Sequence, residues 1–138
     1  MKTVFIFFTL FSYLFQDNLP KSIIGKWTLV CFQDIDNGKN ECEEAEKQKF
    51  PIKLEFKENG IIIGHTSTND ISANYKTQAD NKIKIYNFVG TKLGEFTEWG
   101  GELWKTIGLS SSFKFNKDTL IILYDNDKKV MKFISTQK

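Results

Sequence analysis

The sequence predicts an α+β protein that is mostly β: an antiparallel curled sheet or partly open barrel of about eight strands, with one helix before the last strands. Three observations predict this fold. Apolar and polar residues alternate over many short segments, clusters of Asn, Asp and Gly separate these segments, and one late segment has helical spacing instead. With 138 residues, of which 41% are hydrophobic, the chain has the size of a single domain with one packed core.

The first strand is expected to begin at Gly25. Trp27, Leu29 and Cys31 recur at every second position there and give the strand one mainly apolar face. A strongly polar insertion follows, in which a short helix is expected over residues 41–49. Pro51 would end this helix, because a residue that precedes proline avoids the helical region.

The clearest hairpin joins an expected strand over residues 52–57 to another over 61–65, through the turn Glu58-Asn59-Gly60. Further strands are expected over residues 71–76, 82–86, 112–116, 119–124 and 129–134. Between residues 93 and 107 the apolar residues fall at 93, 96, 99, 103 and 107, which is the spacing of one helix face. Gly100 and Gly101 would weaken this helix by about 1 kcal/mol each relative to Ala.

The charge distribution argues against a nucleic-acid binder. The chain has 19 basic and 17 acidic residues, a net charge of +2, and no arginine among its cations. Arginine is the side chain best suited to bidentate recognition of phosphates and bases, and the small net charge forms no concentrated basic patch.

Residues 1–18 are expected to be a signal peptide. An almost unbroken apolar run over residues 4–15 follows Lys2 and precedes the polar residues Gln16 and Asp17. The run is shorter than the roughly 20 residues of a membrane-spanning helix and fits a secretory signal. No small-x-small pattern marks a cleavage site, so a retained anchor or a buried strand is the alternative. We therefore expect a secreted or periplasmic protein that is not integral to a membrane after cleavage.

Cys31 and Cys42 are the two cysteines of the chain. In an oxidising compartment they are expected to form a disulfide, and two free buried thiols are the alternative. A metal site or a redox pair fits less well, because the chain has a single histidine and no Cys-x-x-Cys motif. No cofactor or metal is expected.

Several short motifs follow one another after residue 24. They include Gly25 and Trp27 in G-x-W-x-L, then Gly64, Asn69 and Tyr75 in one segment, then Thr91, a helix from Glu102, and a closing hairpin from Asp118. In this order they resemble the META domain, the family that includes the bacterial heat-inducible HslJ proteins. The resemblance covers residues 23–138.

The resemblance implies a non-enzymatic secreted or envelope accessory protein, with a role in stress tolerance, resistance to some antibiotics or, in certain parasites, motility and virulence. It also marks two departures. Many members carry Gly-Cys-Asn where this chain has Ser67-Thr68-Asn69, and another cysteine where Glu95 or Phe96 stands. Any redox role of those cysteines therefore does not transfer to this chain, and its protein partner stays unidentified.

The sequence offers no convincing catalytic set. His65 is the one histidine, and a general base beside the hydroxyls of residues 66–68 is less well supported than a strand-end histidine with a local hydrogen bond. Asn69 and Tyr75 are interpreted as structural residues in a turn and a core. The acidic stretch from Asp34 lacks the glycine position and the final carboxylate of a calcium loop.

Two other functions compete with the META-type accessory protein. G-x-W near the start of an exported β-rich chain is also typical of lipocalins, whose barrel binds a small hydrophobic ligand. Such a ligand would be lined by Phe56, Ile85, Phe113 and Phe115, although these side chains could equally fill the interior. The third function is a protein-docking domain or inhibitor that uses Trp99 and Trp104.

Overall fold

Residues 22–136, which the computed structural model describes, form nine β-strands, one α-helix and three short 3₁₀ helices. The expected signal peptide lies outside these residues. The elements follow in the order β1 (Gly25–Asp34), β2 (Asn40–Cys42), η1 (Ala45–Lys47), β3 (Lys53–Phe56), β4 (Ile61–His65), β5 (Asp70–Gln78), η2 (Ala79–Asn81), β6 (Lys82–Gly90), α2 (Glu98–Thr106), η3 (Ile107–Leu109), β7 (Ser110–Asn116), β8 (Thr119–Tyr124) and β9 (Lys129–Ser135).

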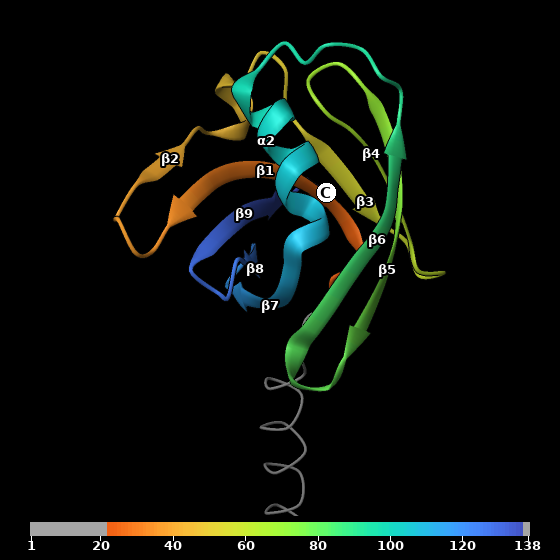
Figure 1. Ribbon diagram of the computed structural model, residues 1–138, viewed down its shortest axis with the longest axis vertical. Coiled ribbons are helices and arrows are strands. Elements are labelled where there is room, and N and C mark those ends of the chain that lie inside the picture. The colour runs from red at the N-terminus through yellow and green to blue at the C-terminus, as the bar shows by residue number, and fades with distance from the viewer. Residues whose placement is uncertain (1–21, 137–138) are drawn as a thin grey trace, which may run out of the picture.

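The strands close into an eight-stranded antiparallel barrel, with β2 as one extra strand. Consecutive strands from β3 to β9 are neighbours, β1 pairs with β3 on one side, and β1 also pairs with β9 to close the ring (Figure 1). The predicted hairpin is confirmed, since Phe56 pairs with Ile62 and Gly60 adopts φ +81° in the turn between β3 and β4. The predicted fold class, including the single helix before the last three strands, is therefore correct.

Side chains from every wall of the barrel fill its interior. Those that are almost completely buried are Leu29, Leu54, Phe56, Ile62, Leu103, Leu120, Ile122, Met131 and Phe133. They come from strands far apart in the sequence and from α2, so the core is a single contact cluster. Burial of this apolar surface is the main favourable contribution to folding.

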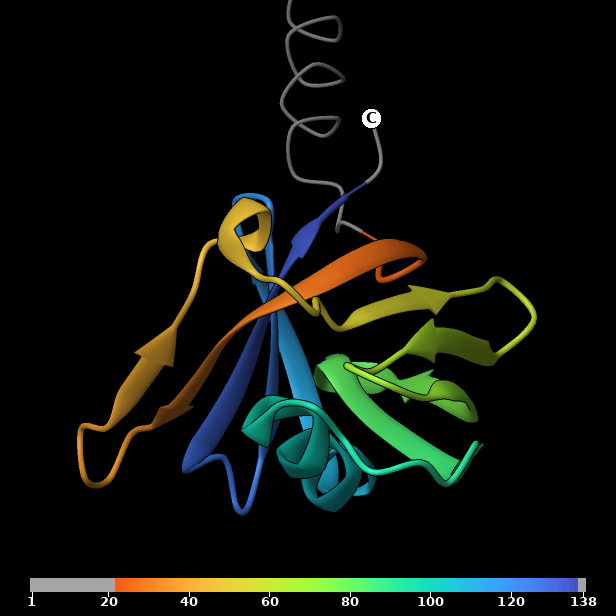
Figure 2. The ribbon, with the colours of Figure 1, turned by 90° about the horizontal axis from the view of Figure 1, so that it is seen from above.

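The weakest seam of the barrel lies between β6 and β7, which pair through one residue couple, Lys82 and Ser112. The segment formed by α2 and η3 covers this seam, as the two views of the ribbon agree (Figures 1 and 2). Leu103 and Ile107 project from it into the core, with 0% and 1% of their surfaces exposed. The helix therefore completes a wall that strand pairing leaves open.

A β-bulge changes the direction of side chains in β1. Pairing with β9 is regular up to Leu29 and resumes at Cys31, so Val30 is an extra residue. Beyond the bulge, Phe32 takes the inward position that strict alternation from Leu29 would give to Cys31. The predicted alternation of Trp27, Leu29 and Cys31 on one face is thus wrong at its last member. Cys31 is instead directed to β2.

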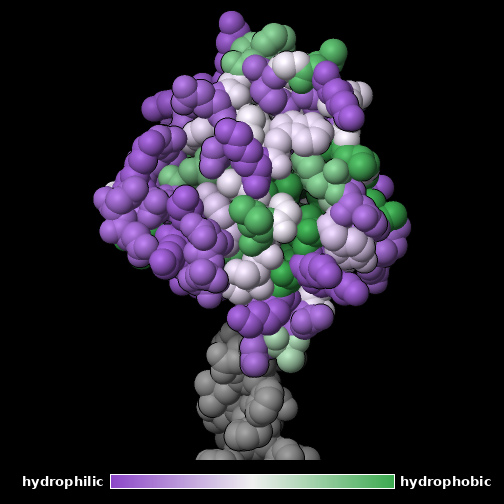
Figure 3. Space-filling view, in the orientation of Figure 1, coloured by the Kyte–Doolittle hydropathy of each residue, from purple (hydrophilic) through white to green (hydrophobic). Residues whose placement is uncertain are grey.

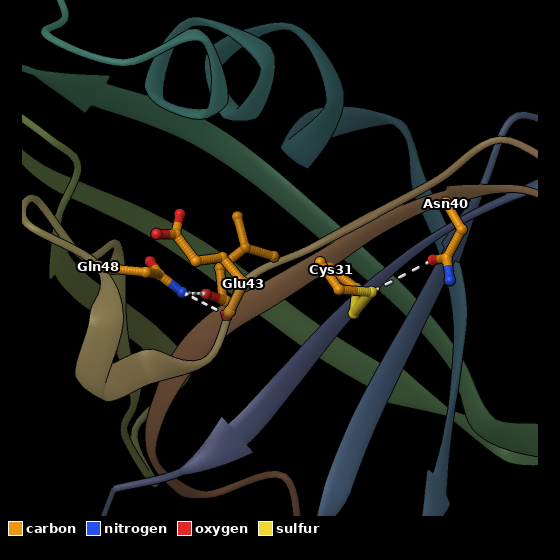
Figure 4. The surroundings of a disulfide bond; sticks show 6 residues. Cys31, Asn40, Glu43 and Gln48 are labelled. Atoms are coloured by element: carbon orange, nitrogen blue, oxygen red, sulfur yellow. Dashed lines mark hydrogen bonds between the residues drawn. A yellow bond between two sulfur atoms is a disulfide. The ribbon is translucent and has the colours of Figure 1, made fainter.

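The predicted disulfide joins Cys31 to Cys42, which are register partners of β1 and β2 with Cα atoms 4.1 Å apart (Figure 4). Gln48 supports the same junction, because its Nε2 donates hydrogen bonds to the carbonyls of Leu29 and Glu43, both at 2.9 Å. The exposed three-residue strand β2 is therefore attached to β1 by a covalent bond and by hydrogen bonds.

Two expected helices differ in the structure. The helix expected over residues 41–49 is wrong, because the disulfide holds Cys42 in β2 and only the short η1 follows. The helix expected from residue 93 begins at Glu98. Leu93 and Phe96, which share its periodicity, are 63% and 69% exposed and lie in the preceding loop. Among residues 22–136, no helix is long and apolar enough to cross a membrane.

Loss of the disulfide is expected to lower the free energy of unfolding by about 2 to 3 kcal/mol, because the cross-link restricts a short loop in the unfolded chain. Urea unfolding of the wild type with and without dithiothreitol, beside the double variant Cys31→Ser/Cys42→Ser, measures this effect. Dithiothreitol should destabilise the wild type and leave the variant unchanged. An unchanged wild-type midpoint under complete reduction would contradict the assignment.

Candidate functional site

The densest polar cluster of the described chain surrounds Glu95, in the loop between β6 and α2. Its carboxylate accepts four hydrogen bonds from two segments, the turn between β4 and β5 and the helix α2. The donors are Thr66 Oγ1 at 2.6 Å, Ser67 Oγ at 2.5 Å, Asn69 Nδ2 at 2.7 Å and Trp104 Nε1 at 2.7 Å. We call Glu95 and these four donors the carboxylate lock.

The turn between β4 and β5 prepares three of the donors. Thr66 N–H donates to the Asn69 carbonyl at 2.8 Å, and Asn69 N–H donates to Thr66 Oγ1 at 3.0 Å, so the turn is closed by its own groups. Ser67 Oγ also accepts the backbone N–H groups of Phe96 and Thr97 at 3.0 and 3.3 Å. The same hydroxyl therefore binds the carboxylate and the backbone just after it.

Asn69 uses every hydrogen-bonding position of its amide and is 1% exposed. Its Nδ2 donates to Glu95 and to the Leu93 carbonyl at 2.9 Å. Its Oδ1 accepts from Thr91 Oγ1 and from Leu93 N–H, both at 2.8 Å. Asn69 thus holds the loop from residue 91 to residue 95 in one conformation.

The electrostatics of the lock favour the ionised carboxylate. Burial alone would raise the pKa of Glu95, but the hydrogen bonds from Ser67, Thr66, Asn69 and Trp104 outweigh it and lower the pKa to about 2. Glu95 is therefore charged throughout the physiological pH range. A carboxylate this weakly basic, with its oxygens already occupied, is poorly suited to general acid or base catalysis.

The lock also fixes the start of α2. Thr97 is the N-cap, and its Oγ1 accepts the N–H of Gly100 at 3.0 Å. Trp104, one turn further on, donates to Glu95, and its ring packs edge-on against Phe88 of β6 with centroids 4.7 Å apart. The position of α2 over the barrel seam therefore depends on the loop that carries Glu95.

The structure brings together two of the six family-motif residues, Asn69 and Thr91, in and beside the lock. The others lie elsewhere. Gly64 belongs to β4, where a Cβ would lie 2.8 Å from Leu54 Cδ2. Gly25 begins β1, and Trp27 Nε1 donates to the Ile23 carbonyl at 2.8 Å. Tyr75 packs against Phe56 and donates its hydroxyl to the Lys57 carbonyl.

His65 does not take part in the lock. Its Nδ1 lies 2.9 Å from Asp70 Oδ1, across the exposed end of the β4–β5 ladder, and so its partner is a carboxylate and not one of the neighbouring hydroxyls. Within residues 22–136, no group of three or more His, Cys, Asp or Glu side chains is arranged to hold a metal ion.

The four residues expected to line a hydrophobic ligand lie in or against the packed core. Phe56, Ile85 and Phe113 are buried members of the core cluster, and Phe115 is partly buried against it. Phe113 and Phe115 contact each other edge-on, with ring centroids 5.9 Å apart. In this structure these side chains pack against protein.

Sequence reasoning missed Thr66, Ser67, Glu95 and Trp104 as one cluster. From the sequence, Glu95 stands only where many META proteins have a cysteine, and Trp104 is predicted only as a docking aromatic. The available signal was the run of hydroxyl residues before Asn69, since four consecutive small polar side chains supply more donors than a tight turn needs. Their common acceptor lies nearly thirty residues later in the chain, in a loop whose apolar spacing continues that of the following helix.

The fold and the lock together define an antiparallel β-barrel whose seam is closed by a helix. No family model matches the chain, and no curated protein matches it. Among solved structures, the crystal structure of a DUF4847 family protein from Bacteroides vulgatus is similar. Its TM-score is 0.62 and its sequence identity 16%, over 83% of this chain and 94% of that chain. At this identity the similarity establishes the barrel fold alone.

The two adjacent glycines of α2 provide a test of the lock. A Cβ at Gly100 would lie 2.7 Å from Ser67 Oγ and even closer to the Glu95 carboxylate, whereas a Cβ at Gly101 would meet nothing within 4 Å. Gly101→Ala should therefore stabilise the protein by about 0.5 to 1 kcal/mol through helix propensity. Gly100→Ala should destabilise it by about 1 to 3 kcal/mol through overpacking.

Both substitutions are made in the same helix and add the same methyl group, so each is the control of the other. Thermal and urea unfolding measure the difference. Two changes of the same sign and size would show that the carboxylate is not held against Gly100.

Proposed function

We propose that the protein is a non-enzymatic accessory protein of the META/HslJ type that acts outside the cytosol in stress tolerance. The observation that carries this proposal is the saturation of the carboxylate lock. Asn69 and Thr91 are two residues of the family motif. Their side-chain hydrogen bonds hold the loop that leads from β6 to α2. These two motif residues are therefore interpreted as requirements of the fold.

The same observation argues against hydrolytic or transfer chemistry. A nucleophilic hydroxyl needs a neighbouring base that can accept its proton. Ser67 and Thr66 donate to a carboxylate whose pKa is lowered to about 2 by those hydrogen bonds, and such a group is too weak a base for this task. The imidazole of His65 is paired with Asp70 instead.

A further contact supports the META resemblance. Many members of that family carry cysteines at the places that Thr68 and either Glu95 or Phe96 occupy here. Thr68 Oγ1 accepts the N–H of Phe96 at 3.0 Å, so the two segments lie side by side. In this chain hydrogen bonds join the segments in which relatives place their cysteines.

Location outside the cytosol is supported by the Cys31–Cys42 disulfide, because such bonds persist in oxidising compartments. The apolar segment over residues 4–15 would supply the export signal. A lipocalin-like carrier is the second candidate and has less support, since the side chains that would line its ligand are packed in the core.

Expression of the full chain in a bacterium that lacks its own HslJ protein tests the proposal. We expect a processed, oxidised protein in the envelope or medium that restores antibiotic tolerance. A chain without residues 1–18 should remain inside the cell and fail to restore it. Intact mass spectrometry identifies the new N-terminus and the loss of two cysteine hydrogens. An unprocessed, reduced product in the cytosol, or tolerance that is independent of the leader, would refute the proposal.

A further inference from the structure

The open end of the barrel beside α2 forms a cleft of about 320 Å³ that the function proposed above does not use. This volume is at the lower end of the range of small-molecule sites, roughly 300 to 1,000 Å³. Its walls come from β1, the hairpin that carries β2, the adjoining ends of β8 and β9, and α2. In Figure 3, hydrophilic residues cover the lobe that carries β2, and residues of intermediate hydropathy lie between this lobe and α2. We call this space the mouth cleft.

Aromatic rings form the floor and one wall of the mouth cleft. Phe32, which the β-bulge turns inward, packs edge-on against Trp99 with ring centroids 5.6 Å apart. Tyr124 ends β8 on the same interior face as Leu120 and Ile122. Because Trp99 is only partly buried, its ring offers an aromatic surface to a ligand in the cleft.

The charge of the mouth cleft is mainly negative. Four acidic residues, Asp34, Glu41, Glu98 and Glu102, line it together with two lysines. Lys39 pairs with Glu41 at 3.1 Å, and Lys129 pairs with Asp125 at 3.8 Å, so both cations are already engaged. Asp34 Oδ1 accepts two backbone N–H groups of its own turn.

Glu98 and Glu102 have no direct partner. The pKa of Lys39 is raised mainly by its hydrogen bond and charge interaction with Glu41, and the charges of Glu98 and Glu102 raise it to a smaller extent. The two glutamates are four residues apart on the exposed face of α2, and neither side chain makes a hydrogen bond or an ion pair within residues 22–136. Like charges at this spacing repel each other and slightly destabilise a helix. A cation in the cleft would relieve that repulsion.

Tyr124 supplies an independent indication of a ligand. The side chain is 4% exposed, yet its hydroxyl makes no hydrogen bond in the described chain. The hydroxyl is also not among the fully enclosed polar atoms that lack a partner, so it opens into the cleft that Tyr124 lines. The ring of Tyr124 is therefore buried while its hydroxyl stays free to bond a group that enters the cleft. Burial, together with Glu102, Asp34 and Asp125, raises the pKa of Tyr124 to about 12, so the hydroxyl keeps its proton.

We propose that the mouth cleft binds an alkylammonium group, with Glu98 and Glu102 as the charged partners, Tyr124 as a hydroxyl partner and the Trp99 ring against the alkyl chain. An ammonium group satisfies carboxylates and a hydroxyl at once, and its chain packs on aromatic faces. The ligand is either the lysine side chain of a partner or a free alkyl amine. This inference deepens the proposed function, because it gives the accessory protein a ligand class.

NMR titration of the mature protein tests the inference, with the indole signal of Trp99, assigned through Trp99→Phe, as the reporter. One probe is N-acetyl-lysine methylamide, with N-acetyl-norleucine methylamide as its neutral match. The other is 1,5-diaminopentane, with 1,5-pentanediol as its match. We expect saturable shifts with the amines only. A response to the lysine probe alone identifies a partner's side chain, and a response to the diamine alone identifies a free amine.

Matched variants separate the mouth cleft from general electrostatics. Glu98→Gln/Glu102→Gln should weaken binding at least tenfold, while Glu46→Gln/Glu58→Gln, which removes the same charge from outside the cleft, should change it less than twofold. Tyr124→Phe should weaken binding several-fold without lowering the melting temperature, since no hydrogen bond is lost.

Absence of saturable shifts with either amine would overturn the inference, as would equal responses to the neutral probes or equal weakening by both double variants. Tight binding of Ca²⁺ alone to the same residues would overturn it in favour of a metal site. The titration uses purified protein and measures neither export nor antibiotic tolerance. Amine binding can therefore fail while the proposed function stands, and the proposed function can fail while amine binding is observed.

Discussion

A partly buried, ionised carboxylate needs hydrogen-bond donors, and this requirement organises the segment from the end of β6 to α2. Glu95 meets it with four hydrogen bonds from the β4–β5 turn and from α2. Because the donors belong to different segments, the charge joins them into one unit. The loop from residue 91, the N-cap of α2 and the closure of the seam between β6 and β7 all follow from this arrangement. Removal of the charge would leave several donors unsatisfied together, which is far more costly than the loss of one exposed hydrogen bond.

Other residues of α2, Glu98, Trp99 and Glu102, line the mouth cleft, where the polar groups are arranged differently. The bulge at Val30 turns Phe32 towards the interior and Cys31 towards β2, so one irregularity sets both an aromatic wall of the mouth cleft and the disulfide that holds its hairpin. At the lock every acceptor is occupied by the chain itself. At the mouth cleft two carboxylates and one hydroxyl make no hydrogen bond or ion pair in the described chain. The contrast separates a polar cluster that serves the fold from a surface that is available to a ligand.

The fold class was predictable because alternation and turn residues are local signals. Ile52 to His65 encodes its hairpin within one short stretch, and the alternation of the later strands matches the observed registers. The lock was not predictable in the same way, since Glu95 has no partner near it in sequence and its loop shares the spacing of the following helix. Leu93 and Phe96 continue that spacing by position only and lie exposed outside α2. The bulge likewise has no sequence signal, so the inward position of Phe32 became visible only from strand pairing.

The pKa of Glu95 is the most direct test of this account. The structure lowers it to about 2 from an ordinary value of 4.5, so the carboxylate stabilises the fold above the ordinary value, and this contribution is lost as the pH falls towards 2. The ¹³C shift of the Glu95 carboxyl carbon, assigned through Glu95→Gln and followed with pH, measures the value. A midpoint near 2 in the folded protein is the predicted result. A midpoint near 4.5 while the protein remains folded would show that the donors do not hold the charge, and the lock would not be the basis of this structure.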